Sequence, residues 1–229
     1  MHLGSSTPLF GRPLKAALLL GHSNAGKSPV GEALAARLSS EHRRLVHLDF
    51  GALLRRVCTE TAFPRVTSRD VAYVRSVMNG RLITEKHFDT VRRLLQGFAE
   101  TGSVDPTADD LLLNGFPRDT AQARPAEELG IDVRMVIFLD CTPQIAYRRK
   151  QRSERGEGFE DRRGRGDEAY EIFLRKVRSF EKDTRPLLDF YAAQSVPSVR
   201  FSVGESTSPD QVVDTVAEAV AEALDRRLH

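Results

Sequence analysis

Short apolar runs alternate with longer amphipathic stretches along this chain. Apolar runs at 16–20, 45–48, 111–113 and 133–140 are bounded by polar or turn residues, and a fifth at 196–203 alternates in its second half. Such runs are typical of parallel strands buried on both faces. Helical periodicity predicts helices over 30–39, 50–58, 68–78, 84–100, 120–129, 143–152, 167–193 and 209–228. Strands that alternate with helices predict an α/β fold built around a doubly wound parallel sheet.

Several residues mark the ends of these predicted helices. Thr142 and Ser208 each precede a proline, so each can cap a helix whose first position is that proline. Gly130 follows the stretch 120–129 and is typical of a helix stop. We therefore expect helix boundaries close to these three positions.

Composition narrows the class of protein. The 229 residues carry 34 Lys and Arg against 32 Asp and Glu, a net charge of +2, which gives no general argument for a nucleic-acid or membrane partner. Cys58 and Cys141 have neither disulfide-framework nor zinc-site spacing. Residues 1–13 contain no apolar leader segment, and no apolar run approaches the roughly 20 residues of a membrane span. We expect a cytoplasmic single-domain protein with a flexible segment at 1–13.

The stretch 21–28, G-H-S-N-A-G-K-S, matches the phosphate-binding loop G-x-x-x-x-G-K-S, and it lies between a predicted strand and a predicted helix. In such a loop backbone N–H groups converge on phosphate oxygens, Lys27 reaches the β and γ phosphates, and Ser28 offers its hydroxyl to Mg²⁺. A chance glycine-lysine turn is the alternative, but it would not require the flanking strand and helix. Pro29 is tolerated in the first helical turn, and we expect His22 to be exposed on the loop. The predicted ATP site comprises Gly21, Asn24, Ala25, Gly26, Lys27 and Ser28, with Mg²⁺ as cofactor.

Further motifs resemble one family. The stretch N-G-F-P-R-D-T-A-Q at 114–122 resembles the D-G-F-P-R-x-x-x-Q signature of the adenylate kinase and related nucleoside monophosphate kinase family. Stretches at 47–55, 80–84, 165–168 and 184–191 resemble other motifs of that family, in the same order. The resemblance implies a three-layer P-loop NTPase fold with a five-stranded parallel sheet over 14–229. It also implies a monophosphate-binding helical segment at 49–83 and a cysteine-free, zinc-free lid of intermediate length at 153–164.

The same resemblance implies roles for individual residues. Arg55 and Arg118 would hold the acceptor phosphate, because guanidinium forks match phosphate oxygens. Gln122 would read the acceptor base. The other implied residues are Phe50, Gly51 and Gly115 in the monophosphate site, Arg148 and Gly204 in the ATP site, and Arg148, Arg152, Arg165, Asp167 and Lys176 in catalysis and lid closure. The arginines of 148–165 could instead form a nucleic-acid patch, but interspersed acids and a single Phe159 do not resemble a stacking platform.

The chain departs from the family pattern at positions that bear on activity. Asn114 stands where the family has the aspartate that holds Mg²⁺ through water, and an amide carries no charge. Phe50 and Ala52 replace a threonine and an aspartate of the acceptor-base helix, and Lys176 replaces an arginine, with Arg175 beside it. Asp49 offers a substitute carboxylate for the metal; the equally acceptable alternative is that it only caps the following helix.

These observations favour a monomeric nucleoside monophosphate kinase that uses Mg²⁺-ATP, with AMP as the default acceptor and no nucleic-acid or membrane partner. Two alternatives stay open at this point. One is a P-loop kinase for another small acceptor, or a slow ATPase; the other is a nucleotide-sensing protein that barely turns over.

Overall fold

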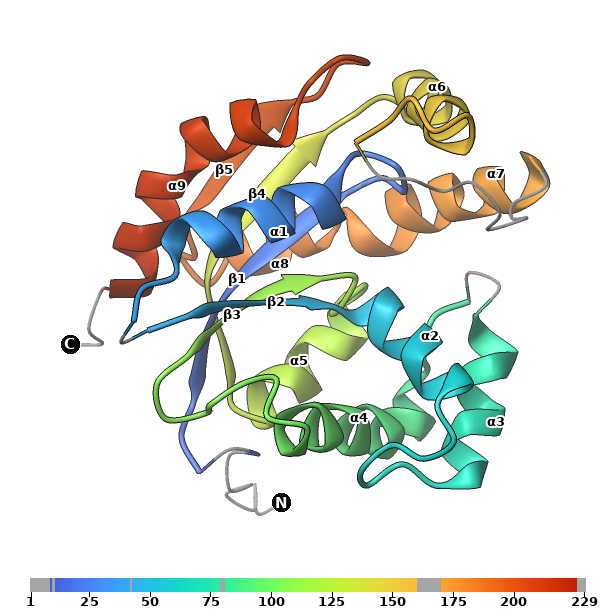
Figure 1. Cartoon of the computed structure of the whole chain (residues 1–229), viewed down its shortest axis with the longest axis vertical. Helices are drawn as coiled ribbons and strands as arrows, with labels where there is room; N and C mark the ends of the chain where they lie inside the picture. Colours follow the sequence, from blue (N-terminus) through green and yellow to red (C-terminus); the bar gives the residue numbers. More distant parts are fainter. Residues whose placement is uncertain (1–8, 10, 42, 79–80, 160–169, 226–229) are drawn as a thin grey trace.

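The computed structural model describes residue 9 and residues 11–41, 43–78, 81–159 and 170–225. Within these residues, five parallel strands form one sheet in the order β2-β3-β1-β4-β5 (Figure 1). The strands are β1 (Leu14–Gly21), β2 (Leu45–Asp49), β3 (Asp110–Asn114), β4 (Ile131–Asp140) and β5 (Ser198–Ser202). Each apolar run that predicted a strand forms one. The central position of β1 places the phosphate-binding loop at the middle of the sheet's carboxyl edge, where ligands bind in open α/β sheets.

Two apolar layers cover the two faces of the sheet, and β1 shows how. Leu18 and Leu20 belong to one buried cluster, whereas Ala17 and Leu19 belong to the other, because successive strand side chains point to opposite faces. The first cluster includes residues of α2 (Phe50–Thr59), α3 (Ser68–Val77), α4 (Phe88–Glu100), α5 (Thr120–Glu128) and α8 (Leu187–Ala192). The second includes residues of α1 (Lys27–Leu38), α6 (Pro143–Glu154), α7 (Tyr170–Ser179) and α9 (Pro209–Asp225). This is the three-layer α/β architecture that the sequence predicts.

The predicted helix boundaries are largely confirmed. Thr142 accepts a hydrogen bond from the Ile145 N–H, and Ser208 accepts one from the Gln211 N–H, as N-caps do. Gly130 has a φ of +87°, which suits its place after α5. The predicted helix at 84–100 begins with a short 3₁₀ turn, Glu85–His87, before α4.

The predicted continuous helix at 167–193 is wrong. Within its described part, α7 ends at Ser179, a π-helical turn covers Phe180–Thr184, and α8 follows. The Arg185 N–H donates to the Phe180 carbonyl five residues back, at 2.8 Å. Pro186 has no N–H, and its ring crowds the preceding turn, so the helix widens just before it.

A glycine lets α1 lie close to β2. A Cβ atom on Gly31 would lie 2.3 Å from Nε2 of His47, so only a residue without a side chain fits against that imidazole. Burial lowers the pKa of His47, against the opposing attraction of Asp49, and the ring is therefore neutral at pH 7. This close packing brings the start of α1 and the end of β2 together, which matters for the site described below.

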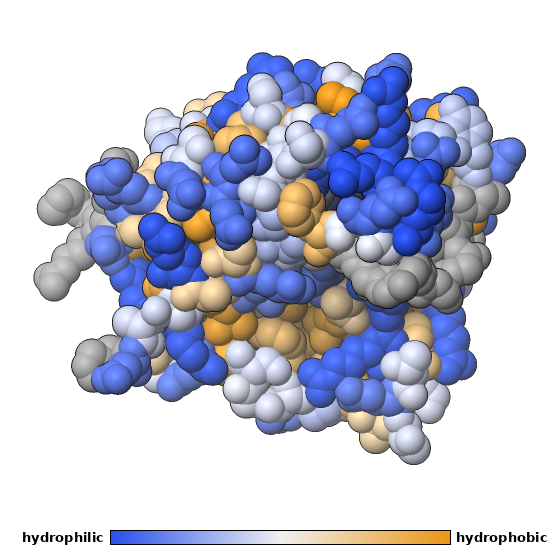
Figure 2. Space-filling view, turned by 45° about the horizontal axis from the view of Figure 1, so that its top comes forward, coloured by the Kyte–Doolittle hydropathy of each residue, from blue (hydrophilic) through white to orange (hydrophobic). Residues whose placement is uncertain are grey.

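The surface offers little apolar area. Figure 2 shows a mostly hydrophilic face, with apolar residues gathered in a hollow at its lower centre. Among large apolar residues of the described chain, Met78, Phe159 and Tyr170 are exposed. No helix in the described ranges combines the length and the apolar content that a membrane span requires. Cys58 and Cys141 are both free thiols.

Candidate active site

The loop from Gly21 to Ser28 joins β1 to α1, as the motif predicts. Gly21 has a φ of +152°, and a Cβ there would lie 2.8 Å from the Leu139 carbonyl oxygen. Gly26 has a φ of +97° and, having no side chain, caps α1 only through its backbone. The first N–H groups of α1 thus lack a capping side chain, and helix N-termini of this kind bind anions. The loop geometry is therefore suited to phosphate.

Lys27 lies across this loop. Its Nζ donates to the carbonyl oxygens of Gly21 and His22, each at 2.7 Å. The side chain also lines the cavity described below, with Ser23 and Ser28. The ammonium is thus held at the point where the loop meets the cavity.

His22 is buried, so the expectation of an exposed loop histidine is wrong. The residue is 3% exposed, its ring centroid lies 4.3 Å from that of Phe180, and Nε2 is hydrogen-bonded to Oε1 of Glu181 at 2.8 Å. Burial lowers the pKa of His22, and the neighbouring Glu181 only partly offsets this. No local pattern predicts this contact, because the partners are 159 positions apart and meet through the π-helical turn.

A polar cluster lies where β2 and β3 end. Asp49 and Asn114 are opposite each other in the parallel ladder. Ser28 donates its hydroxyl hydrogen to Oδ2 of Asp49 at 2.5 Å, and Nδ2 of Asn114 donates to the same oxygen at 3.1 Å and to Oγ of Ser28 at 3.2 Å. Oδ1 of Asp49 accepts the Ala52 N–H at 2.8 Å. The helix-capping role considered for Asp49 is confirmed, and the same carboxylate also faces the phosphate-binding loop.

The electrostatics of Asp49 follow from these contacts. Burial by itself raises the pKa of its carboxyl, but the hydrogen bonds from Ser28 and from the Ala52 N–H outweigh burial and hold the pKa below its ordinary value. Asp49 is therefore ionised at neutral pH. A negative charge beside a hydroxyl at the phosphate loop is suited to a divalent cation.

No group of three or more His, Cys, Asp or Glu side chains in the described residues could hold a metal ion alone. Mg²⁺ rarely needs such a cage, because it binds through one or two carboxylates, substrate phosphates and water. The oxygen atoms of Ser28 and Asp49 fit that requirement.

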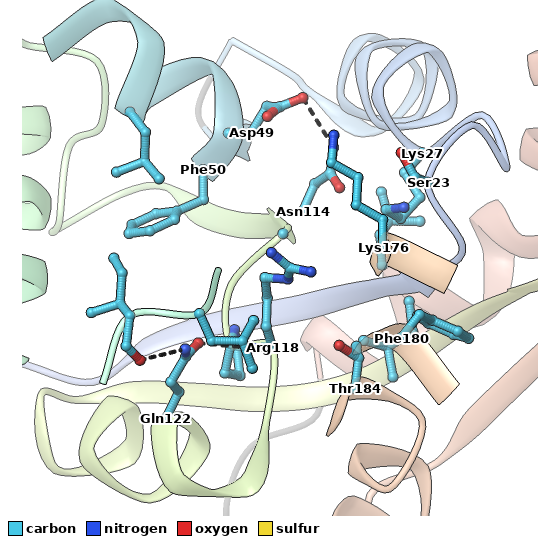
Figure 3. A pocket seen from close by; sticks show the side chains of 18 of the residues that line it. Ser23, Lys27, Asp49, Phe50, Asn114, Arg118, Gln122, Lys176, Phe180 and Thr184 are labelled. Atoms are coloured by element: carbon cyan, nitrogen blue, oxygen red, sulfur yellow. Dashed lines mark hydrogen bonds between the residues drawn. The ribbon is translucent and has the colours of Figure 1, made fainter. Parts of the chain in front are cut away.

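A cavity of about 390 Å³ opens beside the loop. Figure 3 shows Arg118 reaching from below into this space toward Asn114, with Phe50 on one side and Phe180 on the other. The volume lies within the usual range of small-molecule sites. The cavity is lined by every residue that the resemblance assigns to the monophosphate site, namely Phe50, Gly51, Arg55, Gly115, Arg118 and Gln122.

Arg118 is half-buried, and no carboxylate of the described residues balances its charge at short range. Burial lowers the pKa of its guanidinium, while the more distant Asp183 and Asp119 raise it. Across the described ranges, no carboxylate forms an ion pair or hydrogen bond with this guanidinium. A partly desolvated cation without a partner is costly, so an incoming phosphate would relieve the cost.

The side-chain amide of Gln122 already makes two hydrogen bonds within the protein, which is unexpected for a residue that would bind the acceptor base. Its Oε1 accepts the Arg118 backbone N–H at 2.9 Å, and its Nε2 donates to the Ile83 carbonyl at 2.9 Å (Figure 3). One amide hydrogen is left over. The side chain therefore ties the loop after β3 to the segment after α3, and offers a ligand one amide hydrogen and one lone pair of Oε1.

On α7, Lys176 lines the cavity, whereas Arg175 is exposed and does not. The lysine thus supplies the cation from this helix, and the neighbouring arginine does not substitute for it. Lysine keeps the charge but lacks the two-pronged geometry of a guanidinium.

Arg148 and Arg149 are neighbours on α6, and of these two it is Arg149 that contacts the phosphate-binding loop. Its Nε donates to the Asn24 carbonyl at 3.3 Å, and Nη1 donates to the carbonyls of Gly204 and Thr207 at 2.9 and 3.0 Å. Arg148, which the resemblance selected, has a side chain 64% exposed and pairs with Glu205. Sequence reasoning missed Arg149, although it lies three positions after the buried Ala146 and hence on the inward side of the helix.

The remaining lid residues are only partly described. Arg152 donates to the Glu205 carbonyl at 3.3 Å. Arg165, Asp167 and the lid positions 160–164 lie outside the described residues, so their predicted roles stay predictions. The same holds for the division of the chain into core, monophosphate-binding segment and lid.

Exchanging Arg149 for alanine is expected to weaken ATP binding by about tenfold or more, because hydrogen bonds from a charged group to the loop carbonyls are worth about 1.5–3 kcal/mol. Arg148→Ala is the matched control on the same helix. It removes an exposed ion pair worth about 1 kcal/mol or less, so ATP affinity should change by less than about fivefold. Titration of both variants with ATP measures the difference. Unchanged ATP affinity in Arg149→Ala would mean that Arg149 does not position the loop.

Curated sequences similar to this chain carry kinase names. No model of a known protein family matches the chain. Adenylate kinase 1 of Nostoc sp. is 28% identical over 181 residues, covering 76% of this chain and 83% of that protein. The adenylate kinase of Deinococcus radiodurans is 28% identical over 207 residues, covering 88% and 94%. The UMP-CMP kinase of Danio rerio is 29% identical over 181 residues, covering 77% and 83%.

A solved structure agrees at the level of the fold. A protein of Chloroflexus aurantiacus, provisionally described as a kinase, superposes with a TM-score of 0.51 at 14% identity, covering 96% of this chain and 100% of its own. The phosphate loop and the strand order are thus found in a chain that is similar in sequence to adenylate kinases and a UMP-CMP kinase and similar in fold to a further kinase, which supports a phosphotransferase of the adenylate kinase-like type.

Proposed function

We propose that this protein transfers the γ-phosphoryl group of Mg²⁺-ATP to a nucleoside monophosphate, with AMP as the first acceptor to test. The observation that carries the proposal is the convergence of Lys27, Arg55, Arg118 and Lys176 on one cavity beside the phosphate-binding loop. Cations from several elements around one space suit two phosphate groups that must lie close together. The names of the relatives support the same reaction class.

On the donor side, the loop N–H groups and Lys27 bind the β and γ phosphates. Ser28 and Asp49 would hold Mg²⁺, which would supply charge neutralisation on the phosphates. Arg149 keeps the loop in place through Asn24. Together these residues fix the γ phosphorus toward the cavity.

On the acceptor side, Arg118 and Arg55 bind the acceptor phosphate and aim one of its oxygens at the γ phosphorus. A bond forms between that oxygen and the γ phosphorus, the bond to the β–γ bridging oxygen breaks, and ADP leaves with the bridging oxygen. Lys176 and Lys27 neutralise the charge that spreads over the transferred group. No covalent enzyme intermediate is needed.

The acceptor base would lie among apolar side chains. Phe50 is stacked on Phe116 with ring centroids 4.9 Å apart, and Leu54 and Ile83 line the same cavity. The remaining amide hydrogen of Gln122 is the hydrogen bond that this side chain can donate to the base. Contacts of this kind favour a flat base, and a single hydrogen bond gives only modest discrimination between bases.

The experiment is ADP production by purified protein with Mg²⁺-ATP and AMP, CMP, UMP, GMP or dTMP, beside a reaction without acceptor and a Lys27→Met control. Turnover that requires a monophosphate and is lost in the control supports the proposal and identifies the acceptor. Equal turnover without acceptor would identify an ATPase. Absence of turnover despite ATP binding would identify a nucleotide-sensing protein.

A further inference from the structure

We propose that the acid serving the nucleotide-bound Mg²⁺ has moved from β3 to β2 in this chain: Asp49 is the metal-facing carboxylate, and Asn114 is a positioning residue that orients it. The inference rests on the proposed function and assigns the metal site within it. It differs from the pattern implied by the family resemblance, where the acid stands at the position of Asn114.

The first argument is proximity to the residue that defines the metal position. In a phosphate-binding loop the final Ser or Thr hydroxyl lies beside the Mg²⁺. Here that hydroxyl, on Ser28, is 2.5 Å from Oδ2 of Asp49. Asp49 also lines the cavity alongside Lys27 and Ser28. Its carboxylate is therefore one hydrogen bond away from the expected metal position.

The second argument is the use of both carboxylate oxygens. Oδ1 accepts the Ala52 N–H and caps α2, while the partners of Oδ2 among the described residues are the side chains of Ser28 and Asn114. Helix capping needs one oxygen. The other oxygen faces the phosphate loop, and the cap fixes the direction in which it points.

The third argument is the orientation of Asn114. Its Nδ2 donates to Oδ2 of Asp49 and to Oγ of Ser28, so the amide presents hydrogens to the cluster. The amide nitrogen that faces the cluster has no lone pair to offer a cation. An aspartate at 114 would instead place two carboxylates opposite each other in the β2–β3 ladder, where like charges destabilise the pair. An acid at 49 and an amide at 114 are thus complementary.

The test measures metal affinity directly. Mn²⁺, a paramagnetic substitute for Mg²⁺, is titrated into protein saturated with a non-hydrolysable ATP analogue, and bound metal is measured by electron paramagnetic resonance. Asp49→Ser is the decisive variant, because serine keeps a helix-capping oxygen but has no charge. We expect Mn²⁺ affinity to fall by about tenfold or more, while affinity for the analogue without metal and the thermal melting temperature stay near those of the unaltered protein.

The exchange variant Asp49→Asn with Asn114→Asp restores one acid and one amide on opposite strands. We expect it to recover Mn²⁺ affinity to within about threefold, whereas Asn114→Asp alone should lower the melting temperature. Unchanged Mn²⁺ affinity in both Asp49→Ser and Asp49→Asn would overturn the inference and leave Asp49 as a helix cap.

The two proposals fail in different ways. Phosphoryl transfer to a monophosphate with unchanged Mn²⁺ affinity in Asp49→Ser would support the proposed function and refute the metal assignment. Loss of Mn²⁺ affinity in a protein that phosphorylates no monophosphate would do the reverse.

Discussion

Replacing Lys27 by methionine is expected to lower kcat for ADP formation by about 10²–10³-fold, the usual cost of removing one group that stabilises charge in the transition state. Methionine keeps an unbranched stem and removes the ammonium, which the loop carbonyls of Gly21 and His22 hold beside the cavity. The charge on the transferred phosphoryl group would lose its nearest fixed cation on the donor side. Initial rates at saturating Mg²⁺-ATP and acceptor measure the effect.

The control for this variant must show that the protein is still folded. Removing the ammonium also removes two hydrogen bonds to loop carbonyls, so circular dichroism and thermal melting must accompany the rates. A Lys27→Met protein that is folded and keeps more than about a tenth of the activity would contradict the assignment of the loop as the donor site.

Replacing Arg118 by methionine is expected to lower kcat/KM for the acceptor by about 30- to 4,000-fold, since losing one partner of a buried, hydrogen-bonded charge pair costs about 2–5 kcal/mol. The unliganded variant should be as stable as the original protein or more so. In the original, the guanidinium is half-buried without a paired carboxylate among the described residues, and burial lowers its pKa. Acceptor kinetics and urea unfolding without ligand measure the two effects.

Arg175→Met is the matched control, because Arg175 is exposed and does not line the cavity. Its kinetics and its stability should change little. Arg118→Lys adds a further comparison: it keeps the charge and loses the fork, so it should recover only part of the lost acceptor kinetics. If Arg118→Met impaired the donor KM and the acceptor KM equally, Arg118 would not be specific to the acceptor phosphate.

Local sequence patterns were enough to predict the strands, most helices and the phosphate loop. Buried parallel strands read as short apolar runs, and capping residues such as Thr142 and Ser208 satisfy N–H groups only three positions away. The Gly-Lys-Ser spacing of the loop is likewise a local requirement. The placement of Arg118 beside the cavity also followed from its position after a strand at the sheet's carboxyl edge, whereas that of Gln122 was implied by the family resemblance.

Contacts between residues far apart in the chain could not be predicted from local sequence patterns. The prediction that His22 is exposed was wrong because its partner, Glu181, lies in a π-helical turn far along the chain. Arg149 and Arg148 are adjacent in sequence, and only the packing of α6 separates the arginine at the loop from the one paired with Glu205. The roles of the site residues, and AMP as acceptor, stay predictions until the experiments above are made.

The sequence by itself determined the α/β class, the phosphate loop and the family resemblance, because these depend on residues close together along the chain. Tertiary structure alone decided which side chains meet: Gly31 lets α1 approach β2, and that approach brings Ser28 to Asp49 beside Asn114. The sequence left Asp49 as either a cap or a metal partner. The fold gives its two oxygens separate contacts, because a carboxylate at the end of a strand can cap the next helix and face the neighbouring loop at once.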